Sequence, residues 1–314
     1  MPGFLTTRRH RCVGIDISAH AVNIVELSRL NTRFTLHGYA IEPLPRQLAE
    51  DQTRAHPKSV AQVLLRVLGE QAMLARDAVV AVADGQLICK NLELDAGLAG
   101  DELELSVRLE AEQHVPYALE SAALDFEVQG VSPLNPQLMS VLVVACRMET
   151  LDWYQAVLSH AGLKAKVIEV QSHAQVRGID AMMPSSGAVA VVDFATPATR
   201  LSILHQGRVM ESLELHFGDG QQDQDTFKTT ALQHIRHGLE QVAASPRAEL
   251  VILAGAAAGQ PGLSEWLQAK LGMPTQPANP FVHMDINPSL VPQALCSHAP
   301  MLLTACGLAL RGFD

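Results

Sequence analysis

A repeated pattern around Asp16 and Asp193 constrains the fold of this 314-residue chain more than any other feature. Residues 13–17 form an apolar run that carries Asp16 near its end, and residues 190–194 repeat that run around Asp193. After each run come a short turn and two further predicted strands, at 21–28 and 33–41 in the first copy and at 199–206 and 208–215 in the second. Such a repeat indicates two related structural units. Two such units facing each other would bring both carboxylates to one cleft.

The chemistry of such a cleft suits a nucleotide. Turn N–H groups bind phosphate oxygens, and strand-end carboxylates hold Mg²⁺ through water. A later glycine turn at residues 253–255 would add a third segment to the cleft. An aspartate that only caps the turn after its strand is the alternative interpretation, and the pattern by itself leaves both open.

The remaining segments alternate between helical and strand patterns, which is typical of an α/β fold. Apolar residues recur at helical spacing in 56–75, and Pro116 ends a predicted helix at 101–114. Two apolar segments, 78–83 and 86–92, are predicted to form a hairpin through the Asp84-Gly85 dipeptide. The other predicted strands are 122–129, 139–146, 165–170 and 249–254, and the other helices are 149–161, 172–183, 221–244, 261–271 and 300–310.

Composition excludes several classes of function. A net charge of -10 and an aromatic content of 4% argue against a nucleic-acid-binding surface, which is basic and often stacks bases on aromatic rings. No apolar run reaches the ~18 residues that a membrane span needs. The five cysteines form no CxxC pair and mostly lie in apolar runs, so we expect buried, reduced thiols in a cytosolic protein.

Several further segments together resemble one known family. They are LEAEQHVPY at 109–117, LDF at 124–126, ANPF at 278–281 and ACGLALRGFD at 305–314. Combined with the Asp16 and Asp193 segments and the glycine turn, they resemble the actin-like type IV pilus assembly protein PilM family. The resemblance runs in order over nearly the whole chain, and the last two motifs are specific to that family.

The resemblance implies an α/β, actin-like ATPase fold with two RNase H-like lobes around an ATP cleft. The expected first lobe spans residues 1–185, carries an extra α/β subdomain at about 78–145 and receives the C-terminal helix 300–314. The expected second lobe spans 186–299. It is shortened, because residues 217–248 leave room for little beyond one helix.

The resemblance also implies an adaptor function. Family members hold the N-terminal cytoplasmic tail of the inner-membrane protein PilN and link it to pilus motor or platform components. A cytoplasmic location, peripheral to the inner membrane through that partner, follows, with no membrane span and no catalytic or separate metal-ligand residues. The expected partner-groove residues are Leu103, Val107, Glu110, Val115, Pro116 and Tyr117. The expected ATP and Mg²⁺ contacts are Asp16, Ser18, Asp193, Thr196 and Gly255.

The sequence departs from the family in its nucleotide segments. Ser18 stands where the first turn normally has glycine, the turn after Asp193 reads FATP, and two alanines follow Gly255 where the family has Gly-Ser. A Cβ obstructs the approach of phosphate to backbone, and Pro197 lacks an N–H donor. These changes predict weakened ATP and Mg²⁺ binding and no detectable hydrolysis.

Two other functions stay open on sequence grounds. An active actin-like ATPase or small-molecule kinase would use the same cleft, although the missing glycines argue against it. A cytoplasmic component of a type II-like secretion assembly would share the fold, but such proteins are usually followed by a membrane span, and this chain ends at Asp314. Titration with Mg-ATP and with a PilN-like tail peptide separates these hypotheses.

Overall fold

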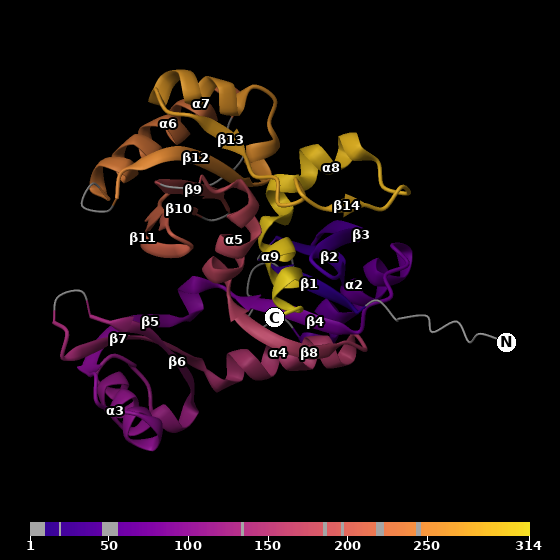
Figure 1. Ribbon diagram of the computed structural model, residues 1–314. Coiled ribbons are helices and arrows are strands. Elements are labelled where there is room, and N and C mark those ends of the chain that lie inside the picture. Colours follow the sequence, from indigo (N-terminus) through magenta and orange to yellow (C-terminus); the bar gives the residue numbers. More distant parts are fainter. Residues whose placement is uncertain are drawn as a thin grey trace.

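The strands of this protein form three sheets, one in each of two lobes and one in a smaller subdomain (Figure 1). The computed structural model describes residues 10–18, 20–45, 56–132, 135–184, 187–195, 198–217, 223–242 and 246–314.

The first lobe is built on a six-stranded sheet of order β14-β3-β2-β1-β4-β8. Its strands are β1 (Arg11–Ile17), β2 (Ala21–Leu30), β3 (Arg33–Pro43), β4 (Asp77–Val82), β8 (Lys164–Val170) and β14 (Asp285–Ile286). The central strand β1 is buried on both sides because helices cover both faces of the sheet. Strands buried on two faces are near-continuously apolar, as β1 and β4 are.

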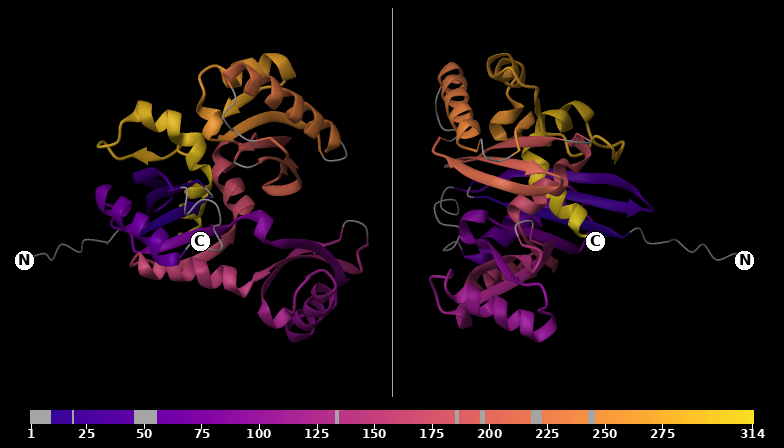
Figure 2. Two further views of the ribbon diagram at one scale, coloured as in Figure 1. Left: turned by 180° about the vertical axis from the view of Figure 1, so that it is seen from behind. Right: turned by 60° about the vertical axis from the view of Figure 1, so that its left-hand side comes forward.

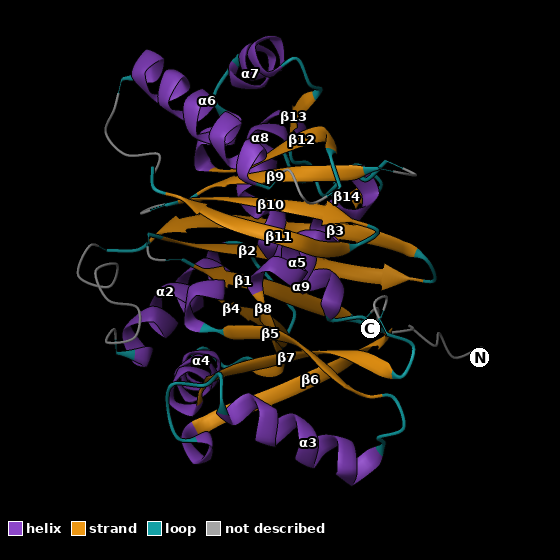
Figure 3. Cartoon of the chain, turned by 90° about the vertical axis from the view of Figure 1, so that its left-hand side faces the viewer, coloured by secondary structure: helices purple, strands orange, loops and turns teal. Residues whose placement is uncertain are grey.

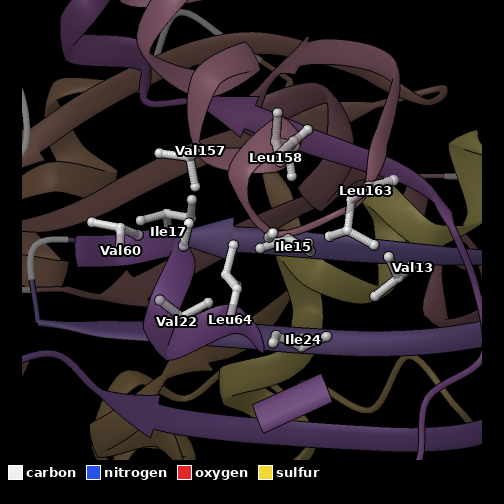
Figure 4. Close-up of a cluster of buried hydrophobic side chains, with 14 of the residues drawn as sticks. Val13, Ile15, Ile17, Val22, Ile24, Val60, Leu64, Val157, Leu158 and Leu163 are labelled. Carbon is white, nitrogen blue, oxygen red and sulfur yellow. The ribbon is translucent and has the colours of Figure 1, made fainter. Parts of the chain in front are cut away.

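Helices α2 (Pro57–Glu70) and α4 (Met148–His160) cover one face of this sheet. Figure 4 shows how Val13 and Ile15 of β1 lie among Leu64 of α2 and Leu158 of α4. The opposite face is covered by α5 (Gln171–Ile179), α8 (Pro292–His298) and α9 (Leu303–Arg311), the last two joined by the 3-10 helix η5 (Ala299–Leu302).

The second lobe is a five-stranded sheet of order β11-β10-β9-β12-β13. Its strands are β9 (Ala188–Phe194), β10 (Thr199–His205), β11 (Arg208–Leu215), β12 (Ala248–Gly255) and β13 (Thr275–Pro277). Helices α6 (Gln224–Gln241) and α7 (Leu263–Leu271) pack on one face, and the short 3-10 helices η3 (Asp180–Met182) and η4 (Ala256–Gly259) flank the sheet. As in the first lobe, an antiparallel neighbour and a parallel neighbour flank the Asp-bearing strand.

Helices α5 and α9 lie side by side between the two main sheets (Figure 3). Their backbones approach closely at Gly307, where an added Cβ would lie 1.8 Å from the carbonyl oxygen of Ala174. Gly14 of β1 is as constrained, because its Cβ would lie 2.0 Å from the carbonyl oxygen of Ala305. These glycines therefore let α9 pack directly on the first sheet and on α5.

The extra subdomain is a three-stranded sheet of order β5-β7-β6 covered by one helix. It consists of β5 (Ile88–Asp95), α3 (Gly100–Glu112), β6 (Ala122–Val131) and β7 (Leu138–Arg147), with the 3-10 helices η1 (Asp84–Gln86) and η2 (Leu119–Ser121) before β5 and β6. The views in Figure 2 show the subdomain projecting from the rest of the molecule.

Three expectations from the sequence are corrected here. Residues 78–83 and the strand after them form no hairpin, because β4 pairs with β1 and β8 whereas β5 pairs with β7. The subdomain therefore begins after Val82, not at 78. The chain also returns to the first lobe before residue 300, because β14 pairs with β3. Residues 285–299 thus do not belong to the second lobe.

One helical stretch, Pro292–Arg311, has the length and mean hydropathy (1.3) of a membrane span. It consists of α8, η5 and α9, and 61% of its most apolar window is buried inside the protein. A core helix meets the same criteria, and α9 packs against β1 and α5. Its apolar character is therefore explained by its place in the core.

Candidate functional site

The repeated aspartates Asp16 and Asp193 lie at equivalent ends of β1 and β9, and both are largely buried between the lobes. Asn23 Nδ2 donates to Asp16 Oδ2 at 3.4 Å, and Gln175 Nε2 donates to Asp193 Oδ2 at 2.6 Å. Burial, followed by the negative charge of Asp193, raises the pKa of Asp16 to about 7. Because the charge of Asp193 acts on Asp16, the two repeated acids lie near each other.

The pKa of Asp193 is also raised, mainly by burial. The hydrogen bond from Gln175 and the positive charge of Arg200 oppose this rise, while the charge of Asp84 adds to it. Arg200 therefore lies close enough to stabilise the ionised form of Asp193. Burial thus raises the pKa of both acids, and for Asp16 the pKa reaches about 7.

This raised pKa predicts an unusual dependence of stability on pH. An acid with a folded-state pKa near 7 and an ordinary value of 3.8 takes up a proton on folding between those values. From this group alone, folding stability falls by up to about 1.4 kcal/mol per pH unit as pH rises from about 4 to 7. Asp16→Asn should remove that slope in urea denaturation at pH 5 and pH 7.5. The same slope in both proteins would contradict the account.

The turn after β1, where the sequence predicts phosphate contacts, is closed by hydrogen bonds of Ser18. Ser18 Oγ accepts hydrogen bonds from the N–H groups of Ala21 at 3.0 Å and of His20 at 3.3 Å, and donates to Ala21 O at 2.9 Å. The N–H of Ser18 bonds to the same carbonyl at 2.9 Å. Amides that would face a phosphate are thus occupied within the turn. Thr196, the predicted contact in the second turn, lies outside the described residues.

Gly255 is required for a structural reason. Its φ is +83°, and an added Cβ would lie 2.2 Å from the carbonyl oxygen of Phe194 in the neighbouring strand. Near Asp16, Asn23 Oδ1 is buried and has no hydrogen-bond partner among the residues that the structure describes, an arrangement that would suit a hydrated cation. Asp16 and Asp193 are therefore the acidic side chains that could hold a hydrated cation here, whereas the amides of Ser18, His20 and Ala21 bond within the first turn.

The predicted partner groove needs partial correction. Leu103 and Val107 are buried between α3 and the subdomain sheet, beside Leu92 and Val143, and so belong to the subdomain core. Val115 is also buried, three residues after the end of this helix. The face of α3 that carries Leu103 and Val107 packs against the subdomain sheet. Helical spacing of apolar residues indicates a buried face but does not say what covers it.

The other three predicted groove residues lie at the surface or near a cavity. Glu110 is half-buried and Pro116 is exposed. Tyr117 lines a cavity of about 610 Å³ together with residues 85–88 and the first turns of α4, and the guanidinium of Arg147 lies 4.5 Å from its ring centre. We call this space the hinge cavity.

A second cavity of about 410 Å³ lies between the subdomain and the first lobe. Five consecutive residues of β6, 123–127, line one side, and four of β8, 167–170, line the other. Among the described residues β6 and β8 are each the last strand of a sheet, and both line this space. Leu142, Val144 and Leu151 provide apolar surface. We call this space the edge groove.

Comparison with known proteins fits this architecture. The sequence matches the type IV pilus assembly protein PilM family over residues 14–234 and 224–313. The chain belongs to the type IV pilus assembly protein PilM family. A solved structure described as a PilM-PilN type IV pilus biogenesis complex is similar to this PilM-family chain with a TM-score of 0.81 and 24% identity, covering 96% of this chain and 98% of that chain.

Two other solved structures are similar to this PilM-family chain at lower scores. The ethanolamine utilization protein EutJ from Carboxydothermus hydrogenoformans has a TM-score of 0.50 and 14% identity, covering 96% of this chain and 89% of that chain. A Bacteroides thetaiotaomicron protein with an actin-like ATPase fold has a TM-score of 0.49 and 10% identity, with coverages of 87% and 93%. The family match and the PilM-PilN structure confirm the actin-like fold that the sequence motifs implied.

Sequence reasoning missed several residues of these sites in the PilM-family chain. Gln175 and Arg200, which contact or influence Asp193, lie on a helix and a strand without any motif of their own. The edge of β8 was missed because edge position is a property of the whole sheet. Asp84 was predicted to form a hairpin, although the contrast between apolar β4 and the alternating, charged β5 could have indicated two different sheets.

Proposed function

We propose that this chain is an adaptor in type IV pilus assembly that holds the N-terminal cytoplasmic tail of a PilN-like membrane protein in the edge groove. The observation that carries the proposal is that β6 and β8, each the last described strand of its sheet, line one shared groove. An extended peptide placed there gains main-chain hydrogen bonds, and alternate side chains enter pockets. The family and the PilM-PilN match support this choice of partner.

The lining of the edge groove indicates the chemistry of the tail. Its walls contribute apolar side chains, including Leu142, Val144 and Leu151. The exposed acids Asp125 and Glu127 of β6 also line it, as register partners of Val144 and Leu142. A tail with apolar residues on one face and a basic residue on the other complements this surface. Through that tail the protein would sit in the cytoplasm, peripheral to the inner membrane, and reach motor or platform components.

The nucleotide cleft has a secondary part in this proposal. It binds Mg-ATP weakly and does not hydrolyse it, because the amides of Ser18, His20 and Ala21 already bond within the turn. Charge-assisted hydrogen bonds contribute ~1.5–3 kcal/mol each, so two lost donors weaken binding by roughly a hundredfold or more. An active ATPase or kinase on this fold would need those donors free.

Calorimetry with two ligands tests the proposal. We expect a synthetic peptide carrying the PilN-like tail to bind with a Kd on the order of micromolar, because a disordered tail loses conformational entropy when it is ordered. Mg-ATP should bind with a Kd weaker than about 100 μM, which corresponds to a binding free energy of less than ~6 kcal/mol. A low-micromolar Kd for Mg-ATP, combined with no binding of the tail, would contradict the proposal and favour an active nucleotide site.

The variant Val144→Asp tests whether the tail binds in the edge groove. Val144 lines the groove and is half-buried, so a charge there would be desolvated by the bound tail and binding should be lost. Val128→Asp is the matched control, because Val128 lies on β6 of the same sheet, is 45% exposed and does not line the groove. Equal tail affinity of the two folded variants would exclude this location.

A further inference from the structure

The junction between the first lobe and the extra subdomain carries a carboxylate that three parts of the molecule share. Asp84 begins η1, the turn in which the chain leaves β4 of the main sheet and enters β5 of the subdomain. Its Oδ1 accepts a 2.7 Å hydrogen bond from Ser172 Oγ on α5. Its Oδ2 lies 3.6 Å from Arg200 Nη1 on β10 of the second lobe. The Asp84 side chain thus connects three parts of the molecule: the η1 turn, which we call the hinge, helix α5 and the second lobe.

The contact with Arg200 matters because Asp84 is poorly hydrated. The side chain of Asp84 is 15% exposed and that of Arg200 is 27% exposed. Asp84 Oδ2 is buried and makes no hydrogen bond among the described residues, so the guanidinium charge is its main compensation. Removing one partner of a shielded ion pair leaves an uncompensated buried charge, which is strongly unfavourable. Screening by solvent is weaker here than for a surface pair.

Arg200 also lies close to Asp193, the buried acid of β9. It is the register partner of Asp193 on the neighbouring strand, so both side chains leave the same face of the sheet. The positive charge of Arg200 lies near two carboxylates, one in the cleft and one at the hinge. A change in charge at Asp193 therefore changes how strongly Arg200 holds Asp84.

The hinge segment reaches the edge groove as well. Leu87, three residues after Asp84, lines the edge groove, the hinge cavity and a third cavity of about 1050 Å³ between the subdomain and the second lobe. A displacement of the Asp84 carboxylate must move this short segment and with it a wall of the groove. Arg208 of the second lobe also contacts the subdomain, through a 3.4 Å hydrogen bond from its Nη2 to the carbonyl of Gln129 at the surface.

We propose that the Asp84–Arg200 ion pair is a latch that holds the second lobe against the subdomain hinge and thereby keeps the edge groove in its tail-binding geometry. The part that concerns the tail rests on the proposed function. When the latch opens, the hinge turn loosens, the subdomain rotates away from β8 and the two strand edges no longer meet one peptide. The second lobe thus regulates the partner groove without touching it.

Hydrogen exchange of the full chain, followed by mass spectrometry without any peptide, tests the latch by itself. In Arg200→Gln we expect amides of residues 83–88 to exchange at least about tenfold faster than in the unchanged protein, which corresponds to ~1.4 kcal/mol of lost local protection. Arg200→Lys should restore part of the protection because it keeps the charge. Arg208→Gln is the control and should leave residues 83–88 unchanged. Unchanged exchange in Arg200→Gln would overturn the latch.

Titration of the same proteins with the PilN-like tail peptide tests the coupling. Arg200→Gln should bind the peptide five- to tenfold more weakly. If the two residues act as one pair, Asp84→Asn combined with Arg200→Gln should bind no more weakly than Arg200→Gln alone. Faster exchange with unchanged peptide affinity would overturn the coupling to the groove. If the unchanged protein does not bind the peptide, the proposed function fails, and the exchange result still decides whether the latch exists.

Discussion

Replacing Gly14 with alanine is expected to destabilise the protein by about 3 kcal/mol or more. The new Cβ would lie 2.0 Å from the carbonyl oxygen of Ala305 and 2.3 Å from the amide nitrogen of Ala309. Both atoms belong to the backbone of α9, so no side-chain rotation relieves the contact. Either α9 moves off the sheet or the strand distorts, and each change disrupts the packing of the first lobe. Urea denaturation followed by circular dichroism measures the loss.

Gly69→Ala provides the matched control for that substitution. Gly69 lies in α2, and nothing lies within 4 Å of an added Cβ. Alanine is favoured over glycine inside a helix by roughly 0.5–1 kcal/mol, so this variant should gain stability. A Gly14→Ala protein as stable as Gly69→Ala would mean that α9 does not pack on β1 as described.

Val107→Asp should unfold the extra subdomain. Val107 is fully buried between α3 and the subdomain sheet, so an aspartate there would be a buried charge without a partner. Changes of this kind cost about 4 kcal/mol or more. Loss of helix signal and rapid proteolysis of residues 88–147 are the expected results, with tail binding lost as a consequence.

Leu105→Asp separates this explanation from direct binding. Leu105 lies on the same helix but is 60% exposed, and surface substitutions usually change stability by no more than about 0.5 kcal/mol. We expect this variant to fold and to bind the tail normally. A folded, stable Val107→Asp protein that had lost only its tail binding would return Val107 to the groove where the sequence had placed it.

Much of the fold was predictable because its signals are local. The runs around Asp16 and Asp193 are apolar and nearly continuous, which is typical of strands buried on both faces, and their repetition indicated two lobes. The glycine and small-residue pattern at 305–314 marked the C-terminal helix through its motif. Residues 285–299 were misplaced because the two-residue strand β14 has too little sequence to show a pattern.

The candidate sites were less predictable because they depend on long-range pairing. The Asp84-Gly85 dipeptide favours a tight turn in any context, and only the partners of β4 and β5 decide whether that turn joins one sheet or two. The apolar stripe containing Val107 indicated a buried face correctly, but a partner peptide and a subdomain sheet would leave the same pattern in the sequence. The self-bonded turn at Ser18 follows from a serine hydroxyl that accepts local amides, a competition typical of serine.

Hydrogen exchange of the protein with and without the PilN-like tail peptide tests the central claim most directly. Strand addition in the edge groove predicts slower exchange of amides along β6, at residues 123–127, and along β8, at 167–170, which line that groove and belong to edge strands. The turns of the nucleotide cleft at residues 17–21 and 255–258 should be unaffected in rate. Protection confined to those turns, with none on β6 or β8, would contradict the account.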